Sequence, residues 1–130
     1  MNSTELITAA QRIGSDPLLV QGAGGNLSEK RGDGSIAIKA SGTRLKDAGS
    51  RQIFAVLDVE QARTQVLVRE DLSDLVDDES RKAGLRPSIE TSIHTLLPHR
   101  FVFHVHAVGT IAAGSSVNPA ALEPPTGWRA

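Results

Sequence analysis

Residues 101–106, which read Phe-Val-Phe-His-Val-His, constrain the fold of this 130-residue chain more than any other segment. Alternating apolar positions predict a buried strand here. Strand side chains alternate between faces, so His104 and His106 project from one side, with Cα atoms about 6.6–6.8 Å apart. Phe103 and Val105 then point into the opposite layer. The chain must therefore build a sheet that carries two imidazoles on one face.

Short helical and extended patterns alternate along the rest of the sequence. Asn2-Ser3-Thr4-Glu5 has the form of a capping box, and Gly14 is placed to end the helix that follows. This alternation predicts an α/β layered domain, with a mixed or a parallel sheet. The other expected helices cover residues 58–65, 88–97 and 108–113, and the expected strands cover residues 18–20, 36–39, 53–57 and 101–106. Loops are expected at residues 21–30 and 40–43, and a solvent-facing loop with a helical turn is expected at residues 69–84.

The composition argues against several classes of function. The 14 Lys and Arg nearly balance 15 Asp and Glu, so no strongly basic face suggests nucleic acid. With three Phe, one Trp and no Tyr, few rings are available for base stacking. The absence of cysteine leaves histidine and carboxylate as metal ligands. No signal-peptide pattern and no apolar run of about 18 residues is present, which predicts a cytoplasmic protein with no membrane partner.

The two histidines of the predicted strand are candidate metal ligands. Two imidazoles on one strand face can converge on one ion, with Zn–N bonds of about 2.0–2.1 Å. The alternative is a strand whose polar side happens to carry two histidines, since His-x-His is a short pattern. A third protein ligand is usual in catalytic zinc sites. His94 is open to this role or to a surface pairing with Glu90 four residues earlier, and His99 is expected to be solvated.

Glu90 is the candidate acid or base. It falls in the first turn of the expected helix 88–97, where the helix dipole favours an ionised carboxylate. A carboxylate near a metal acts as a ligand or as a proton carrier. The alternative is an ordinary helix-start glutamate, which any protein can have.

Three small-residue segments are candidates for binding an anion. The first, residues 22–28, has neither the Lys-Ser/Thr ending of a nucleotide P-loop nor a complete GxGxxG pattern. Its backbone amides and the Asn26 side chain can still form a nest for phosphate. Ser41, Gly42 and Ser88 offer further hydroxyl and amide donors. Taken singly, each segment is also explained as an ordinary turn.

In combination these segments resemble the class II aldolase/adducin family over about residues 5–113, with the family's motifs in order. The motif-bearing segments are Gly25-Asn26-Leu27-Ser28, Lys39-Ala40-Ser41-Gly42, Arg86-Pro87-Ser88-Ile89-Glu90 and His104-Val105-His106. Residues 86–112 are most similar to the aldolase part of bifunctional rhamnulose-1-phosphate aldolase/short-chain dehydrogenase proteins. Four ordered motifs are far more specific than any one of them.

The resemblance implies a three-layer αβα sandwich around a mostly antiparallel central sheet. It also implies a homo-oligomer, a tetramer in the family, and a small phosphorylated sugar as substrate. The implied reaction is reversible cleavage of a ketose 1-phosphate to dihydroxyacetone phosphate and an aldehyde. Zn²⁺, or another divalent metal, would be held by His104 and His106, with Glu90 as the catalytic acid/base. The implied phosphate ligands are Asn26, Ser41, Gly42 and Ser88.

Two features depart from the family pattern. Ile89 stands where a second serine often precedes the catalytic glutamate, and no histidine follows His106 to serve as the family's third zinc ligand. Residues 1–130 are therefore expected to form one class II aldolase-type domain that is truncated at its C-terminus relative to the family, with residues 115–130 as a loop-like tail. Alternatives to the aldolase are a sugar-phosphate 4-epimerase on the same scaffold and an inactive adducin-like assembly module. A bare nucleotide-binding domain is disfavoured by the incomplete glycine pattern.

Overall fold

The computed structural model describes residues 1–69 and 71–115. The sequence prediction of a loop-like tail at residues 115–130 falls almost wholly outside these residues. The helices are α1 (Thr4–Gly14), α2 (Val59–Gln65), α3 (Asp78–Lys82), α4 (Thr91–Leu96) and α5 (Val108–Gly114), with 3-10 turns η1 (Leu45–Gly49) and η2 (Ser73–Leu75), and the strands are β1 (Asn26–Lys30), β2 (Ser35–Lys39), β3 (Phe54–Asp58) and β4 (Phe101–His104).

The strands form one four-stranded sheet in the order β3-β2-β1-β4, and every neighbouring pair is antiparallel. Within the described residues the sheet is therefore neither parallel nor mixed. Its β3 side is covered in part by α3, because the Ser80 hydroxyl accepts a hydrogen bond of 2.9 Å from the Val56 amide. The β4 strand lies at the other edge of the sheet.

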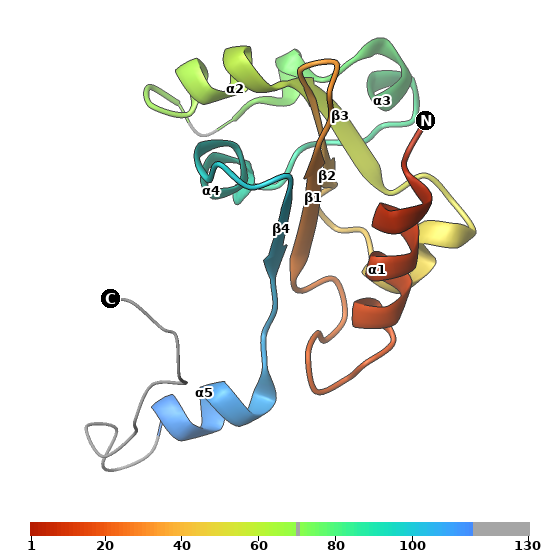
Figure 1. Cartoon of the computed structure of the whole chain (residues 1–130), viewed down its shortest axis with the longest axis vertical. Helices are drawn as coiled ribbons and strands as arrows, with labels where there is room; N and C mark the ends of the chain where they lie inside the picture. Colours follow the sequence, from red (N-terminus) through yellow and green to blue (C-terminus); the bar gives the residue numbers. More distant parts are fainter. Residues whose placement is uncertain (70, 116–130) are drawn as a thin grey trace.

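Helices cover both faces of the sheet, as expected for the αβα arrangement (Figure 1). The α1 and η1 side buries Leu6, Ala10, Leu27 and Phe54 among others. The opposite side, with α2 and α4, buries a second group that includes Ile36, Ile38, Leu57 and Leu72. The three-layer fold predicted from the family resemblance is confirmed, whereas α5 extends away from the sheet beyond β4.

The first helix begins and ends where the sequence predicts. The Ser3 hydroxyl accepts a hydrogen bond of 3.0 Å from the Leu6 amide, which caps the helix. Ser3 also donates to the Glu29 carboxylate at 2.6 Å. The helix is thereby joined to β1 by its cap.

The predicted strand at residues 18–20 is wrong. These residues form a turn, because the Asp16 carbonyl accepts from the amides of Leu19 and Val20, and the Asp16 carboxylate accepts from Leu18. Asp-Pro favours such turns. Local hydrogen bonds at Asp16 thus override the apolar pattern that follows it.

The loop predicted at residues 21–30 is half right, since Asn26–Lys30 form the central strand β1. A search for apolar patterns does not detect this strand, because most of its side chains are polar. They are buried because partners from distant segments satisfy them: Ser28 contacts His94 and Glu29 contacts Ser3 and Arg100. Sequence periodicity does not reveal such partners.

Two boundaries near the predicted site also differ from expectation. The helix expected from residue 88 begins at Thr91, and the strand expected to reach residue 106 ends at His104. Only Val102 of β4 is fully buried, because an edge strand has a neighbour on one side. None of the helices in the described ranges has the length and apolar character needed to cross a membrane.

Candidate metal centre

Glu90, His104 and His106 come together in the folded chain. One ligand atom of each lies within 4.8 Å of the other two, and all three side chains are partly exposed. The Glu90 Oε1 atom lies 2.7 Å from His104 Nδ1, and the two imidazole centroids are 4.9 Å apart. The three residues predicted separately from the sequence are thus neighbours in space.

Different structural elements position the two histidines. His104 is the last residue of β4 and is paired with Asn26 of β1. His106 lies beyond the strand, where its amide donates to the Leu19 carbonyl at 2.7 Å. The turn at residues 18–20 therefore fixes the second imidazole, a role that the sequence did not suggest.

Glycines in the loop before β1 leave room for the histidines. A Cβ atom at Gly24 would lie 3.0 Å from His106 Nδ1, and one at Gly25 would lie 3.0 Å from the His104 carbonyl oxygen. Gly25 also has φ of 70°, a value that favours glycine. The loop packs its backbone directly against the site.

Glu90 is the N-cap residue of α4 and not a residue of its first turn. Its side chain makes no capping hydrogen bond, so the carboxylate is available to His104. It is only 24% exposed, against 43% for the His104 side chain. The ordinary helix-start role does not describe this contact, because the carboxylate turns to β4 and not to its own helix.

The donor set suits a divalent cation of the zinc type. Two imidazoles and one carboxylate are the ligand types that zinc binds in catalytic sites, and three ligand atoms within 4.8 Å of one another can reach one ion. The partial exposure of the three side chains leaves access for a small molecule. The residues present therefore fit such a metal.

The remaining histidines have other surroundings. His94 is 1% exposed, and its Nδ1 atom lies 2.7 Å from the Ser28 hydroxyl. Burial lowers the pKa of His94 to about 4; the Glu90 carboxylate opposes this shift, and His104 and Lys30 add smaller contributions to it. His94 lies outside the three-residue group, and His99 is exposed as expected.

Two of the segments that are predicted to bind phosphate lie side by side in the folded chain. An isolated antiparallel bridge joins Ala40 to Pro87, so Ser41 and Ser88 directly follow paired residues. The Ser41 amide donates to the Arg86 carbonyl at 2.9 Å. The Ser88 hydroxyl accepts from the Glu90 amide at 3.2 Å, which places it one hydrogen bond from the acid/base candidate.

Asn26 and Gly42 complete the predicted phosphate set. Asn26 is 2% exposed, its Oδ1 accepts from the Leu27 amide, and its buried Nδ2 has no hydrogen-bond partner among residues 1–69 and 71–115. A buried amide donor without a partner is costly, so this group is suited to an incoming acceptor. Gly42 has φ of 76° and is exposed.

Lys39 links two of these segments and was not singled out in the sequence as a site residue. Its Nζ donates to the Ala23 carbonyl at 2.9 Å and to the Thr43 carbonyl at 3.0 Å. Burial lowers the pKa of Lys39, and Glu90 partly opposes that shift. A lysine in an otherwise apolar strand was the available signal, because such a position is rarely buried unless it has partners.

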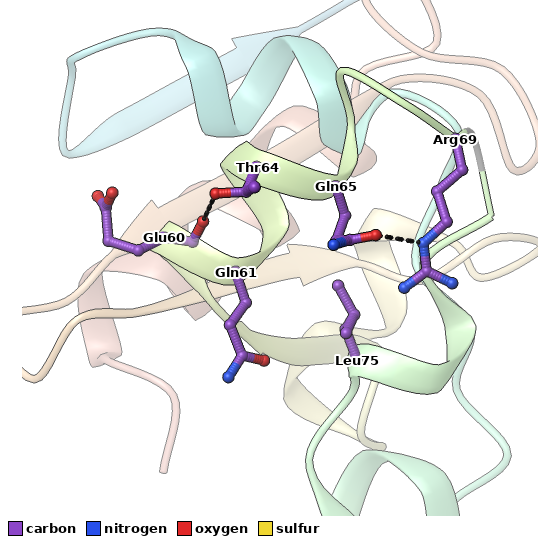
Figure 2. Close-up of a pocket in the computed structure, with 6 residues that line it drawn as sticks. All are labelled: Glu60, Gln61, Thr64, Gln65, Arg69 and Leu75. Carbon is purple, nitrogen blue, oxygen red and sulfur yellow. Dashed lines mark hydrogen bonds between the residues drawn. The ribbon is translucent and has the colours of Figure 1, made fainter.

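Two surface hollows differ in their relation to the site. One of about 290 Å³ lies beside the phosphate segments and is lined by Ser41, Asp71, Ser73, Arg86, Pro87 and Ile89. The other, of about 440 Å³, lies along α2 (Figure 2). There Thr64 and Arg69 are bonded to other lining residues, and no histidine is present. Of these two hollows, only the first is lined by residues of the segments that carry Ser41 and Ser88.

Comparison with known proteins agrees with this fold. Residues 4–128 match the family described as "Class II Aldolase and Adducin N-terminal domain", and no curated protein matches the chain. A structure described as the N-terminal class II aldolase domain of a conserved protein from Thermoplasma acidophilum shares 26% identity with a TM-score of 0.66. The match covers 92% of this chain and 62% of that one, so this chain spans less than two thirds of that relative's length.

Proposed function

The chain belongs to the class II aldolase and adducin family, and from that premise we propose that it is a metal-dependent lyase acting on a sugar phosphate. The reaction would be reversible cleavage of a ketose 1-phosphate into dihydroxyacetone phosphate and an aldehyde. The observation that carries this proposal is the convergence of Glu90, His104 and His106. The closer likeness to rhamnulose-1-phosphate aldolases remains a prediction from the sequence.

His104 and His106 would hold the cation, and Glu90 lies within reach of both imidazoles. A divalent cation bound there would act as a Lewis acid on the hydroxy-ketone oxygens and stabilise their developing negative charge. The pairing of β4 with β1 orients His104, and the hydrogen bond to the Leu19 carbonyl holds the His106 backbone. The open face admits the substrate.

Glu90 would carry the proton at the reacting carbon. In the condensation direction its carboxylate takes a proton from the hydroxymethyl carbon of dihydroxyacetone phosphate. That carbon then bonds to the aldehyde carbon, and the aldehyde oxygen takes a proton from water to become a hydroxyl. In cleavage the hydroxyl loses its proton to water as the same carbon–carbon bond breaks, the electron pair stays on the ketone half, and protonated Glu90 returns its proton to that carbon. Positioned acid–base groups typically contribute about 10²–10⁴-fold to rate.

The phosphate would bind where the small-residue segments meet. The unpartnered Asn26 amide, the Ser41 and Ser88 hydroxyls and the Gly42 backbone supply donors. Lys39 adds a positive charge near the same segments. The apolar Ile89 side chain, 81% exposed, replaces a hydroxyl that would otherwise add one more donor.

Metal content is the first test. The purified chain is expected to take up about one zinc ion per site, and His106→Ala should abolish this uptake. Glu90→Gln should lower the rate of dihydroxyacetone phosphate release from ketose 1-phosphates by about 10²–10⁴-fold. A matched control is Glu60→Gln, because Glu60 is also a helix-start glutamate but pairs with Arg63 on the exposed side of α2.

The products separate this proposal from its alternatives. Zinc uptake with interconversion of pentose phosphates, and no carbon–carbon cleavage, would assign the chain to the epimerases. Zinc uptake without turnover of either substrate class would favour an assembly module. No zinc uptake at all by the folded chain would contradict the metal centre itself.

A further inference from the structure

Four buried polar side chains lie on α4 and the strand beneath it: Ser28, Thr91, His94 and Thr95, each no more than 1% exposed. Thr91 and Thr95 donate to carbonyls of their own segment, at Ser88 and Thr91. His94 differs from both, because its ring reaches across to Ser28 at 2.7 Å. Among these four residues, only the Ser28–His94 pair joins α4 to the sheet.

A second link from β1 reaches the same helix residue. Lys30 Nζ donates to the His94 carbonyl at 2.5 Å and to the His99 carbonyl at 3.1 Å. Burial lowers the pKa of Lys30, with Arg63 adding to the effect. Both the side chain and the backbone of His94 are thus held by β1.

The position of His94 connects this pair to the candidate metal centre. His94 lies one turn after Glu90, and its amide donates to the Glu90 carbonyl at 3.2 Å. On the sheet, Ser28 is two residues from Asn26, which is paired with His104. Ser28 and His104 therefore lie on the same face, and the pair sets how far the start of α4 is from β4.

The outer side of α4 provides little packing to hold the helix in place. Ile93 and Leu96 are 59% and 50% exposed, and Ile89, just before the helix, is 81% exposed. The helix has only six residues, and helices this short are not stable by themselves. Its placement must come from contacts with the rest of the chain, which include α2, through the hydrogen bond of 3.2 Å from Arg63 to the Thr95 carbonyl, and β1, through Ser28 and Lys30.

The His94 ring also has a defined charge state. Because burial lowers its pKa to about 4, the ring is neutral at neutral pH and has one donor and one acceptor nitrogen. Its hydrogen bond with Ser28 then selects the tautomer. A neutral ring connects α4 to β1 without placing a positive charge next to the candidate metal centre.

We propose that Ser28 and His94 are positioning residues, which hold α4 on β1 so that the Glu90 carboxylate meets His104. The pair touches neither substrate nor metal in this role. The inference rests on the proposed function of Glu90, His104 and His106. Ser28 and His94 would thus contribute to the site through the position of Glu90.

The test follows the His104 ring in metal-free protein by ¹⁵N NMR, together with zinc affinity. Ser28→Ala is expected to move the His104 ring signals toward those of Glu90→Gln and to weaken zinc binding about 10–100-fold, the usual loss when a group supporting a ligand is removed. Thr95→Val is the matched control, because it removes a buried hydroxyl of α4 that bonds only to its own helix. That variant should leave the His104 signals unchanged.

A folded Ser28→Ala protein with unaltered His104 signals and zinc affinity would overturn the proposal. If Ser28→Ala does not fold, His94→Asn and His94→Leu replace it. Asparagine keeps a hydrogen-bonding group near the Nδ1 position and should preserve the His104 signals, whereas leucine should not. Equal signals in the two variants would contradict the positioning role.

The same data separate this inference from the proposed function. If the unmodified chain takes up no zinc but Ser28→Ala still moves the His104 signals, the metal centre is wrong and the positioning role stands. If the chain binds zinc and Ser28→Ala changes neither readout, only the positioning role is wrong.

Discussion

The two ends of the sheet differ in burial. At the β3–β2 end, four of five residues of β2 are buried, and only Asp58 of β3 is exposed. At the β4 end only Val102 is buried, and the α5 helix that follows has no buried residue. The candidate metal centre lies at this open end. The buried β3–β2 end contributes most of the core. The more exposed β4 end leaves room for a ligand.

The largest effect expected from this difference is in the core. Phe54→Ala removes a ring that is 1% exposed and should lower the free energy of unfolding by about 3–5 kcal/mol. Phe103→Ala, at a position 49% exposed on β4, should cost less than half as much. Urea denaturation of both variants measures the difference, and equal losses would mean that the two ends form one uniform core.

Acid titration should give the next largest effect, because the His94 ring is buried on the inner face of α4. Its unfolded ring binds a proton below pH 6.5, but the folded ring does so only near pH 4. Stability is therefore complete above the unfolded pKa and is lost as pH falls through this window, by about 3 kcal/mol.

The measurement is unfolding free energy against pH in the presence of a chelator. His94→Leu serves as the reference, because it removes this titration while other groups remain. If the two proteins lose stability in parallel between pH 6.5 and 4, His94 is not the titrating group.

Two glycines give a matched pair of smaller effects. Gly25 and Gly34 both have positive φ, but a Cβ atom at Gly25 would meet Val20 and the His104 carbonyl, while at Gly34 it would meet nothing within 4 Å. Gly25→Ala should cost about 2–3 kcal/mol and Gly34→Ala about 1 kcal/mol. Thermal unfolding compares them, and zinc affinity should fall for Gly25→Ala alone. Equal stability and zinc affinity in the two variants would show that the loop before β1 can accommodate the added methyl group by shifting its backbone.

The smallest effects are at helix caps. Asp58 caps α2 by accepting from the Gln61 amide at 2.8 Å, so Asp58→Ala should lower global stability by about 1 kcal/mol. Ala107 stands at the start of α5 without a side-chain cap. Ala107→Ser should slow amide hydrogen exchange within Val108–Gly114 and leave global unfolding unchanged. A global gain from Ala107→Ser would show that α5 unfolds together with the sheet.

Sequence reasoning was most successful where a local rule decides the outcome. The end of the first helix at Gly14, the Asp58 cap, the strand that contains Ile36 and Ile38, and the family fold are all confirmed. It failed at residues 18–20 and at β1. In the first case Asp16 supplied local acceptors, and in the second polar strand residues were satisfied by partners more than 60 positions away, such as His94 for Ser28.

The sequence by itself determined which groups are available for chemistry: two histidines one residue apart, a glutamate after Pro-Ser, and three small-residue segments in the family order. Residue identity and local periodicity are sufficient for that. Only the tertiary structure decided that Glu90 meets His104, that His106 is held by Leu19, and that His94 is buried against Ser28. These contacts join separate elements, and their geometry depends on how the helices pack on the sheet, which no local pattern encodes.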